Sequence, residues 1–221
     1  MRASSNYKVH ALSCTLTLLG IALLILRFVL THTIFYAFLV WNLFLAALPF
    51  FISQTASKLN ATKTPKIFVL LLSGLWLLFL PNSFYIITDL KHLVLATEHT
   101  VLLDVILVLC FAINGVVLGF YAIDLMLETL TRFFPKLPKR LSLSVLFLLC
   151  GFGVYLGREL RWNSWDILTQ PLPLLEDIFL RLSRPFEYLK TWGITIIFTL
   201  FLGIHYYFFS LLRTKSEAHE N

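Results

Sequence analysis

Two arginines three residues apart are the side chains of this sequence best suited to hold an anion. Arg158 and Arg161 follow a long apolar run, and Trp162 and Trp165 come directly after them. A guanidinium presents paired N–H donors to a phosphate or a carboxylate, and indole rings beside it supply an apolar wall. The spacing therefore predicts a binding site for an anionic or lipid-linked small molecule, with Asn163 as a further polar contact.

Three aspartates are candidates for catalysis or metal binding near such a site. Asp89, Asp104 and Asp166 each lie at or near the end of an apolar run, where a carboxylate can serve as a general base or a metal ligand. Asp89 and His92 are three residues apart, so both lie on one face of a helix or turn and are candidate metal ligands. No second histidine has clear ligand spacing, and the sequence leaves the cofactor unknown.

The composition shows what kind of element must position these side chains. Of the 221 residues, 58% are apolar and only 14% are charged, whereas soluble domains carry about a quarter charged residues. This excludes a disordered chain and a disulfide-rich miniprotein, and it argues against a soluble enzyme. The net charge of +6 does not indicate nucleic acid, because the basic residues stand in short loops between apolar runs. The partner that the composition predicts is a lipid bilayer.

The apolar runs predict an all-α fold, a polytopic bundle of about six transmembrane helices in a single membrane domain over residues 1–221. About 20 apolar residues are needed to span a bilayer. Pro81 is expected to break the third run. Apolar and charged residues alternate with helical period over 173–184, which predicts a short amphipathic helix on the outer membrane surface or a solvated helix packed on the bundle. The six runs are residues 11–31, 34–53, 66–88, 101–127, 141–160 and 188–212.

The basic residues predict the orientation of these runs. Eleven basic residues fall on one side of the membrane and six on the other, with Arg27 inside the first run. The richer side is expected to be cytoplasmic, so both termini lie inside, and residues 89–100 and 161–187 face out. The richer side holds Arg2, Lys8, Lys58, Lys63, Lys66, Arg132, Lys136, Lys139, Arg140, Arg213 and Lys215.

This orientation brings several costly side chains to the outer ends of the helices. An ionisable group inside a bilayer costs about 2.5–3.5 kcal/mol on insertion scales, so it needs a partner, water or a function. Arg27 and Asp104 lie at similar depth and predict a buried ion pair. Together these residues predict one outward-facing polar pocket. Its expected members are Arg27, Asn82, Tyr85, Asp89, His92, Asp104, Arg158, Arg161, Trp162, Asn163, Trp165 and Asp166.

Three classes of function are compatible with such a pocket. A membrane enzyme acting on an anionic substrate would gather the aspartates and arginines in one site. A transporter would need a polar path from the pocket through Asn42 and Asn114 to Asp124 or His205. A structural or assembly protein would pair every charge for packing. The G-x-x-x-G spacing of Gly115 and Gly119 would then mark a close helix contact. Enzymatic activity and oligomeric state stay open.

Two segments of the chain resemble motifs of a known family. Residues 81–90 (PNSFYIITDL) resemble a PN-x-x-Y-x-x-T-D-L motif, and residues 157–166 (GRELRWNSWD) resemble G-R-x-x-R-W-N-S-W-D. Residues 42–46 are also similar to a stretch of the same family, the bacterial integral-membrane proteins called domain of unknown function 1361. The resemblance implies a bacterial inner membrane and a multi-pass protein. It implies no activity.

Overall fold

Helices account for all the secondary structure in the part of the chain described by this computed structural model, which is residues 2–96 and 98–219, and no strand occurs there. Six helices are long and apolar enough to cross a membrane, which confirms the all-α polytopic fold. The structure does not describe the side chains of residues 2–6, 8, 95 and 214–219. Three of the basic residues from which the orientation was predicted, Arg2, Lys8 and Lys215, are among them.

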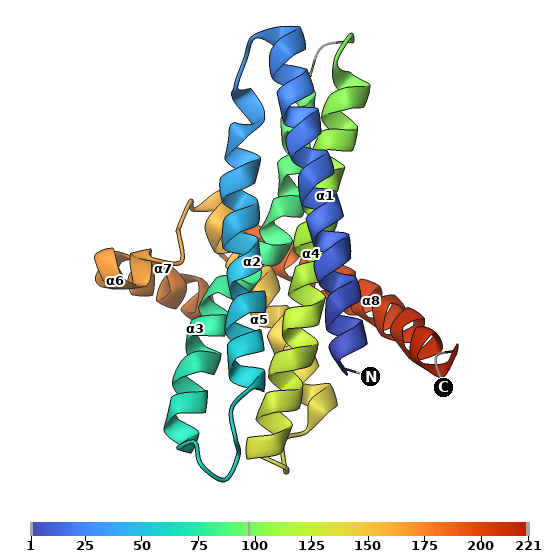
Figure 1. Cartoon of the computed structure of the whole chain (residues 1–221). Helices are drawn as coiled ribbons and strands as arrows, with labels where there is room; N and C mark the ends of the chain where they lie inside the picture. Colours follow the sequence, from blue (N-terminus) through green and yellow to red (C-terminus); the bar gives the residue numbers. More distant parts are fainter. Residues whose placement is uncertain (1, 97, 220–221) are drawn as a thin grey trace. The chain divides into compact units, whose positions relative to one another are not determined.

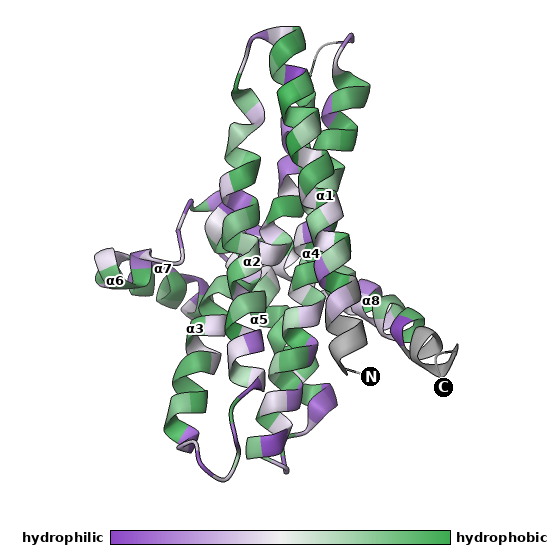
Figure 2. Ribbon diagram, viewed as in Figure 1, coloured by the Kyte–Doolittle hydropathy of each residue, from purple (hydrophilic) through white to green (hydrophobic). Residues whose placement is uncertain are grey.

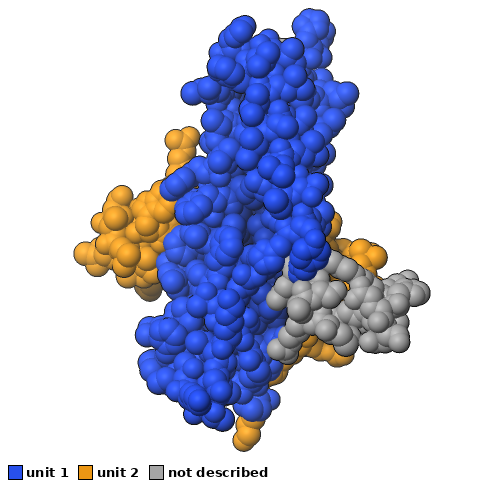
Figure 3. Space-filling model, viewed as in Figure 1, with its two compact units in different colours: residues 1–135 blue, residues 136–221 orange. Residues whose placement is uncertain are grey.

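The chain divides into two compact units, residues 1–135 and 136–221 (Figure 3). The single domain expected from the sequence stays a prediction. Unit 1 holds α1 (Arg2–Thr31), η1 (Phe35–Ala37), α2 (Phe38–Ser57), α3 (Lys66–Tyr85), η2 (Ile86–Leu95) and α4 (Val101–Phe133). Unit 2 holds α5 (Lys139–Glu159), α6 (Asp166–Thr169), α7 (Pro171–Ser183) and α8 (Leu189–His219).

The long helix α4 forms the centre of unit 1, where it packs against α1, α2, α3 and η2 (Figure 1). Two glycines of α4 allow this close approach. A Cβ added to Gly115 would lie 2.9 Å from the carbonyl oxygen of Ser83, and one added to Gly119 would lie 2.8 Å from the Cβ of Ser83. The G-x-x-x-G spacing therefore marks a face where two backbones meet, as small residues commonly do in membrane helices.

Pro81 does not break the third span, contrary to the sequence expectation. Helix α3 continues through Pro81 to Tyr85, and the side-chain amide of Asn82 donates to the carbonyl of Phe79 at 3.0 Å. The change comes later, where the chain tightens into the 3₁₀ helix η2 over Ile86–Leu95. A proline inside a membrane helix loses one backbone hydrogen bond, and packing against neighbouring helices makes this tolerable.

Unit 2 is built on the pair of spans α5 and α8. Gly151 of α5 lies against α8 so closely that an added Cβ would be 2.6 Å from the carbonyl oxygen of Thr195. Thr195 and Thr199 turn their hydroxyls back onto the α8 backbone, which satisfies both hydroxyls within their own helix. The hydropathy colouring shows apolar residues along most of the length of the long helices that face the viewer (Figure 2).

Candidate functional site

Arg27 and Asp104 form a buried ion pair in unit 1, as their shared depth predicts. The Arg27 Nε lies 2.6 Å from the Asp104 Oδ1, and the side chains are 10% and 0% exposed. The two residues stand near the end of α1 and in the first turn of α4, where the helix dipole also favours a carboxylate. The pair thus joins α1 to α4 with both charges compensated.

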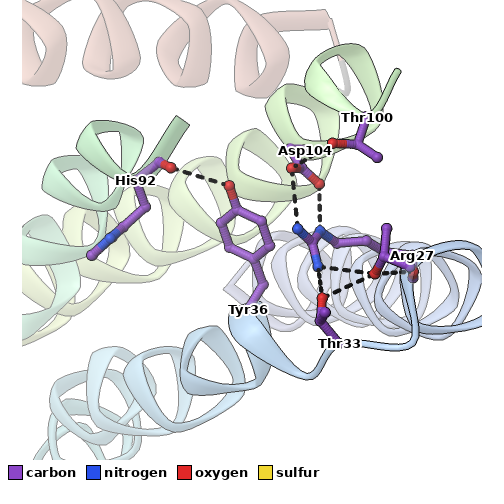
Figure 4. Close-up of polar contacts among 7 residues, drawn as sticks. Arg27, Thr33, Tyr36, His92, Thr100 and Asp104 are labelled. Atoms are coloured by element: carbon purple, nitrogen blue, oxygen red, sulfur yellow. Dashed lines mark hydrogen bonds and ion pairs between the residues drawn. The ribbon is translucent and has the colours of Figure 1, made fainter. Parts of the chain in front are cut away.

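Three threonines complete the hydrogen bonding of this pair (Figure 4). The Arg27 Nη1 donates to the hydroxyl of Thr33 at 2.7 Å and to that of Thr31 at 3.3 Å. The hydroxyl of Thr100 donates to the Asp104 Oδ2 at 3.3 Å. Arg27 thus uses its donors on partners within unit 1, as a buried charge must.

Tyr36 links this ion pair to the second polar group of unit 1. The Arg27 guanidinium carbon lies 4.6 Å from the centre of the Tyr36 ring, a cation–π distance. The Tyr36 hydroxyl donates to the backbone carbonyl of His92 at 3.4 Å (Figure 4). The ring of Tyr36 is fully buried, so α1, η1 and η2 are held together through one aromatic side chain.

Asp89 and His92 lie beside each other in η2. In a 3₁₀ helix, residues three apart eclipse each other, so Ile86, Asp89 and His92 form one column. The Asn42 amide of α2 donates to the Asp89 Oδ2 at 2.8 Å, and the His92 Nε2 is 4.0 Å from the Asp89 Oδ1. Asp89 is 1% exposed, while His92 packs against Phe35 and Phe38.

A metal site was one expectation for this pair. Among the described residues, no group of three or more His, Cys, Asp or Glu side chains is arranged to hold a metal ion. Asp89 has instead an amide donor and a nearby imidazole. Tyr85, whose carbonyl accepts from the Thr88 hydroxyl at 2.6 Å, is half-buried in the same segment.

In unit 2, Asp166 organises the loop that follows α5. Its Oδ2 accepts from the backbone N–H of Asn163 at 2.7 Å and from the Asn163 amide at 3.2 Å. Its Oδ1 accepts from the Thr169 hydroxyl at 3.1 Å. Asp166 is 6% exposed and begins α6, so this carboxylate closes the loop on itself.

Arg161 stands in this loop in a left-handed conformation, with φ of 62°. The backbone N–H of Trp162 donates to the carbonyl of Leu156 at 3.1 Å, which closes the end of α5 behind it. Glycine normally occupies such a position because it has no Cβ, and asparagine does so because its short side chain can hydrogen-bond to the nearby backbone. The side chain of Arg161 is exposed, so no packing within the fold explains why an arginine stands here. Arg158, in the last turn of α5, is half-buried.

The sequence did not predict a buried polar cluster formed by Arg181, Asp177 and Tyr155. Arg181 is 7% exposed, and its Nη1 is 2.7 Å from the Asp177 Oδ1, while its Nε donates to the Tyr155 hydroxyl at 3.2 Å. Burial lowers the pKa of Arg181, but the hydrogen bonds to Tyr155 and Asp177 outweigh that effect and raise it overall. The Trp162 indole donates to the Asp177 Oδ2 at 2.7 Å, so the loop is tied to α7.

The candidate residues thus form two groups, one in each unit. Unit 1 brings Arg27 to Asp104, and Asp89 to Asn42 and His92. Unit 2 brings Asn163 to Asp166 and Trp162 to Asp177, with Trp165 exposed. A single pocket containing members of both groups stays a prediction.

The residues expected to line a transport path are engaged locally. Asn114 of α4 donates to the Thr17 hydroxyl at 2.9 Å and to the carbonyl of Ser13 at 3.2 Å, and so ties α4 to α1. His205 is exposed, and its Nδ1 lies 2.7 Å from the carbonyl of Phe201 one turn earlier in α8.

One comparison with known proteins gave a match. The sequence model of the family described as Protein of unknown function (DUF1361) matches residues 41–205. Comparisons with curated proteins and with solved structures found no match. The matched range begins in α2 and ends in α8, and it includes both motif segments.

Proposed function

This chain belongs to the DUF1361 family, and from that premise we propose that this multi-pass membrane protein recognises an anionic group at the outer face of the membrane. The group is a phosphate or a carboxylate, carried by a lipid or a lipid-linked molecule. The recognition residue is Arg161, and its near neighbours in the chain Arg158, Asn163 and Trp165 are further contacts for the ligand. The proposal places the protein in the bacterial inner membrane with both termini in the cytoplasm, in keeping with the distribution of basic loop residues.

The observation that carries the proposal is the combination of strain and exposure at Arg161. A left-handed backbone costs a non-glycine residue about 1–2 kcal/mol. A buried side chain could recover this cost through packing, but the Arg161 side chain is exposed. Residues held in strained conformations are frequent at binding sites. The guanidinium at this position therefore serves a partner outside the fold.

Hydrogen bonds of the surrounding residues fix the backbone of the loop that carries Arg161. Asp166 accepts three hydrogen bonds within the loop, and the Trp162 indole is anchored on Asp177. A loop with a fixed backbone loses little entropy on binding, and the guanidinium presents a planar pair of donors to two oxygens. A charge-assisted hydrogen bond of this kind contributes about 1.5–3 kcal/mol.

The charged groups of unit 1 support a second, structural role. Arg27 and Asp104 neutralise each other, and Asp89 accepts from Asn42 in a buried position. We assign these side chains to holding α1, α2, η2 and α4 together rather than to the ligand. A role for Asp89, Asp104 or Asp166 as general base would require each to exchange its present partner for a substrate.

Binding of soluble probes to the purified protein tests the proposal. The protein in detergent is titrated with dihexanoyl phosphatidic acid and with inorganic phosphate, and binding is read by native mass spectrometry. Arg161→Asn should weaken binding of the phosphatidic acid about tenfold or more, since one charge-assisted contact is lost. It should keep or raise the melting temperature, because asparagine tolerates the left-handed backbone.

Arg184→Gln is the matched control. Arg184 is an exposed arginine of the same connection and pairs with Glu187 at 3.4 Å. Its replacement should leave binding unchanged. If Arg161→Asn binds the phosphatidic acid as tightly as the unaltered protein does, the proposed function is wrong.

A further inference from the structure

Helix α7 is held close to the membrane by short connections at both ends. Residues 160–165 join α5 to α6, and residues 184–188 join α7 to α8. Because α5 and α8 are candidate membrane spans, six residues or fewer separate the α6–α7 segment from a span on either side. An ion pair between Glu159 and Lys190 also brackets the connection, since these residues stand at the end of α5 and the start of α8.

The side of α7 that faces its own unit carries the buried arginine of this helix. Arg181 and Leu174 are both buried, and Arg181 reaches Tyr155 of α5 and the ring of Tyr188 at 5.0 Å. Leu174 and Arg181 are seven residues apart, so helical spacing puts both on the same face of α7, and this is the face that is buried.

The outward side of α7 is apolar. Leu172, Leu175, Phe179 and Leu182 follow helical spacing on one face and are 77%, 57%, 68% and 56% exposed. Glu176 and Ser183 are exposed along one edge of this face. A helix in water normally buries its large apolar side chains, whereas α7 leaves four of them exposed and buries Arg181. Only an apolar surrounding makes this arrangement favourable.

We propose that α7 lies in the plane of the membrane, with its Leu172–Leu175–Phe179–Leu182 face in the boundary between headgroups and acyl chains. The occupant of this face is lipid, because six residues or fewer separate the α6–α7 segment from the candidate membrane spans α5 and α8. Interfacial helices of this kind bury their apolar face about 5–10 Å into that boundary.

The position of α7 also identifies the carrier of the anion, an inference that rests on the proposed function. The Trp162 indole is bonded to Asp177 of α7, and Arg161 is its chain neighbour. With α7 at the interface, the Arg161 guanidinium lies at the level of the headgroups. The group that it recognises is therefore a phosphate or carboxylate carried by a lipid rather than a free anion.

Spin labels at single cysteines test the placement of α7. The three native cysteines are replaced by alanine, and Leu175→Cys, Phe179→Cys and Glu176→Cys are each labelled in vesicles of phosphatidylcholine and phosphatidylglycerol. Labels at 175 and 179 should collide more often with oxygen, which partitions into lipid, than with a water-soluble nickel chelate. The label at 176, on the polar edge, should show the opposite preference.

Two outcomes would overturn the placement of α7. A label at 179 that collides mainly with the nickel chelate would place this face in water. A label that is shielded from both reagents and broadened by a second label would place another copy of the chain there. Either result leaves the Arg161→Asn experiment in detergent unaffected, so the proposed function can survive it.

The carrier of the anion is tested by competition in the same vesicles. Inorganic phosphate should fail to displace phosphatidylglycerol from the unaltered protein, and Arg161→Asn should retain less of this lipid through purification. Displacement by inorganic phosphate at equal concentration would contradict a lipid-borne ligand. A lipid-facing label at 179 combined with no effect of Arg161→Asn would leave α7 in the membrane and reject the proposed function.

Discussion

The buried ion pair of unit 1 joins residues of two different helices. Arg27 and Asp104 are 77 positions apart in the chain and yet in direct contact. Their pairing was predictable, because each is an isolated charge within an apolar run and an unpaired charge at that depth is costly. Arg181 was not predictable in this way. Its partners Tyr155 and Tyr188 lie in other segments of the chain, and the spacing of residues within α7 does not identify them.

The first prediction concerns the Arg27–Asp104 pair. Arg27→Leu or Asp104→Leu alone should lower the free energy of unfolding by about 3–5 kcal/mol, because each leaves one charge buried without its partner. The double variant should be more stable than either single variant. Chemical unfolding in detergent, read by circular dichroism, gives the four values of this double-mutant cycle. Additive losses in the double variant would show that the two side chains do not depend on each other.

The second prediction concerns Arg181 and its anchor on α5. Arg181→Ala should destabilise unit 2 by about 2–3 kcal/mol, because it removes the charge-assisted hydrogen bond to the partly exposed Asp177 carboxylate and the bond to Tyr155. Tyr155→Phe keeps the ring and removes one hydrogen bond, so it should cost only about 0.5–1.5 kcal/mol. Thermal unfolding in detergent ranks the two variants. Equal losses would contradict the assignment of the main contribution to the ion pair.

Several helix contacts in this protein depend on glycines. The spacing of glycines in the sequence does not identify which of them lie at such contacts. Gly115 and Gly119 form a G-x-x-x-G pattern, which occurs in many membrane helices, and the structure gives the pattern a partner in Ser83 and Phe84. Gly20 and Gly151 have no such pattern, and yet each has a close neighbour across a helix contact. A sequence does not indicate which side of a uniformly apolar helix meets another helix.

The third prediction uses these glycines. Gly115→Ala should destabilise the protein by about 1–3 kcal/mol, because the added methyl group meets a backbone oxygen that cannot move aside. Gly74→Ala is the matched control, since a Cβ added to Gly74 of α3 would meet nothing within 4 Å. It should be neutral or stabilising by up to about 1 kcal/mol through helix propensity. Equal effects on the melting temperature would contradict close packing at Gly115.

The 3₁₀ helix η2 shows where local sequence rules fail. Proline predicts a break at residue 81, but the helix continues and tightens only from Ile86 onward. Ten residues of 3₁₀ helix are unusual, because the hydrogen bonds are poorer than in an α-helix. Packing of η2 on α4 and the bond from Asn42 to Asp89 hold it in place. These are contacts between distant parts of the chain, which local patterns do not contain.

The number and order of the spans follow from hydropathy, because each apolar run of about 20 residues forms one helix that crosses the bilayer. The helices extend beyond the runs at their polar ends. The fourth run ends at residue 127 by composition, whereas α4 continues to Phe133 through Glu128 and Arg132. Charged residues end an apolar run without ending a helix, so span boundaries were predicted less well than spans.

The last prediction concerns the orientation of the spans, which follows from charge alone. Positive residues are retained in the cytoplasm during insertion, and the connections at 58–66 and 132–140 hold seven of them. Fusions of alkaline phosphatase, which is active only outside the cytoplasmic membrane, should be inactive after Asn60 and after Pro135. They should be active after His99 and after Ser183. Fusions of green fluorescent protein at the same positions should give the complementary result.

The fusion after Ser183 bears on both the orientation and the anion site. It follows α7, so an active phosphatase there requires α7 and the preceding loop to lie on the outer side, where Arg161 would meet outer-leaflet headgroups. An inactive phosphatase after Ser183, together with an active one after Pro135, would show that the protein has the opposite orientation in the membrane. The lysines and arginines of the short connections would then have crossed the membrane, and any lipid held by Arg161 would belong to the cytoplasmic leaflet.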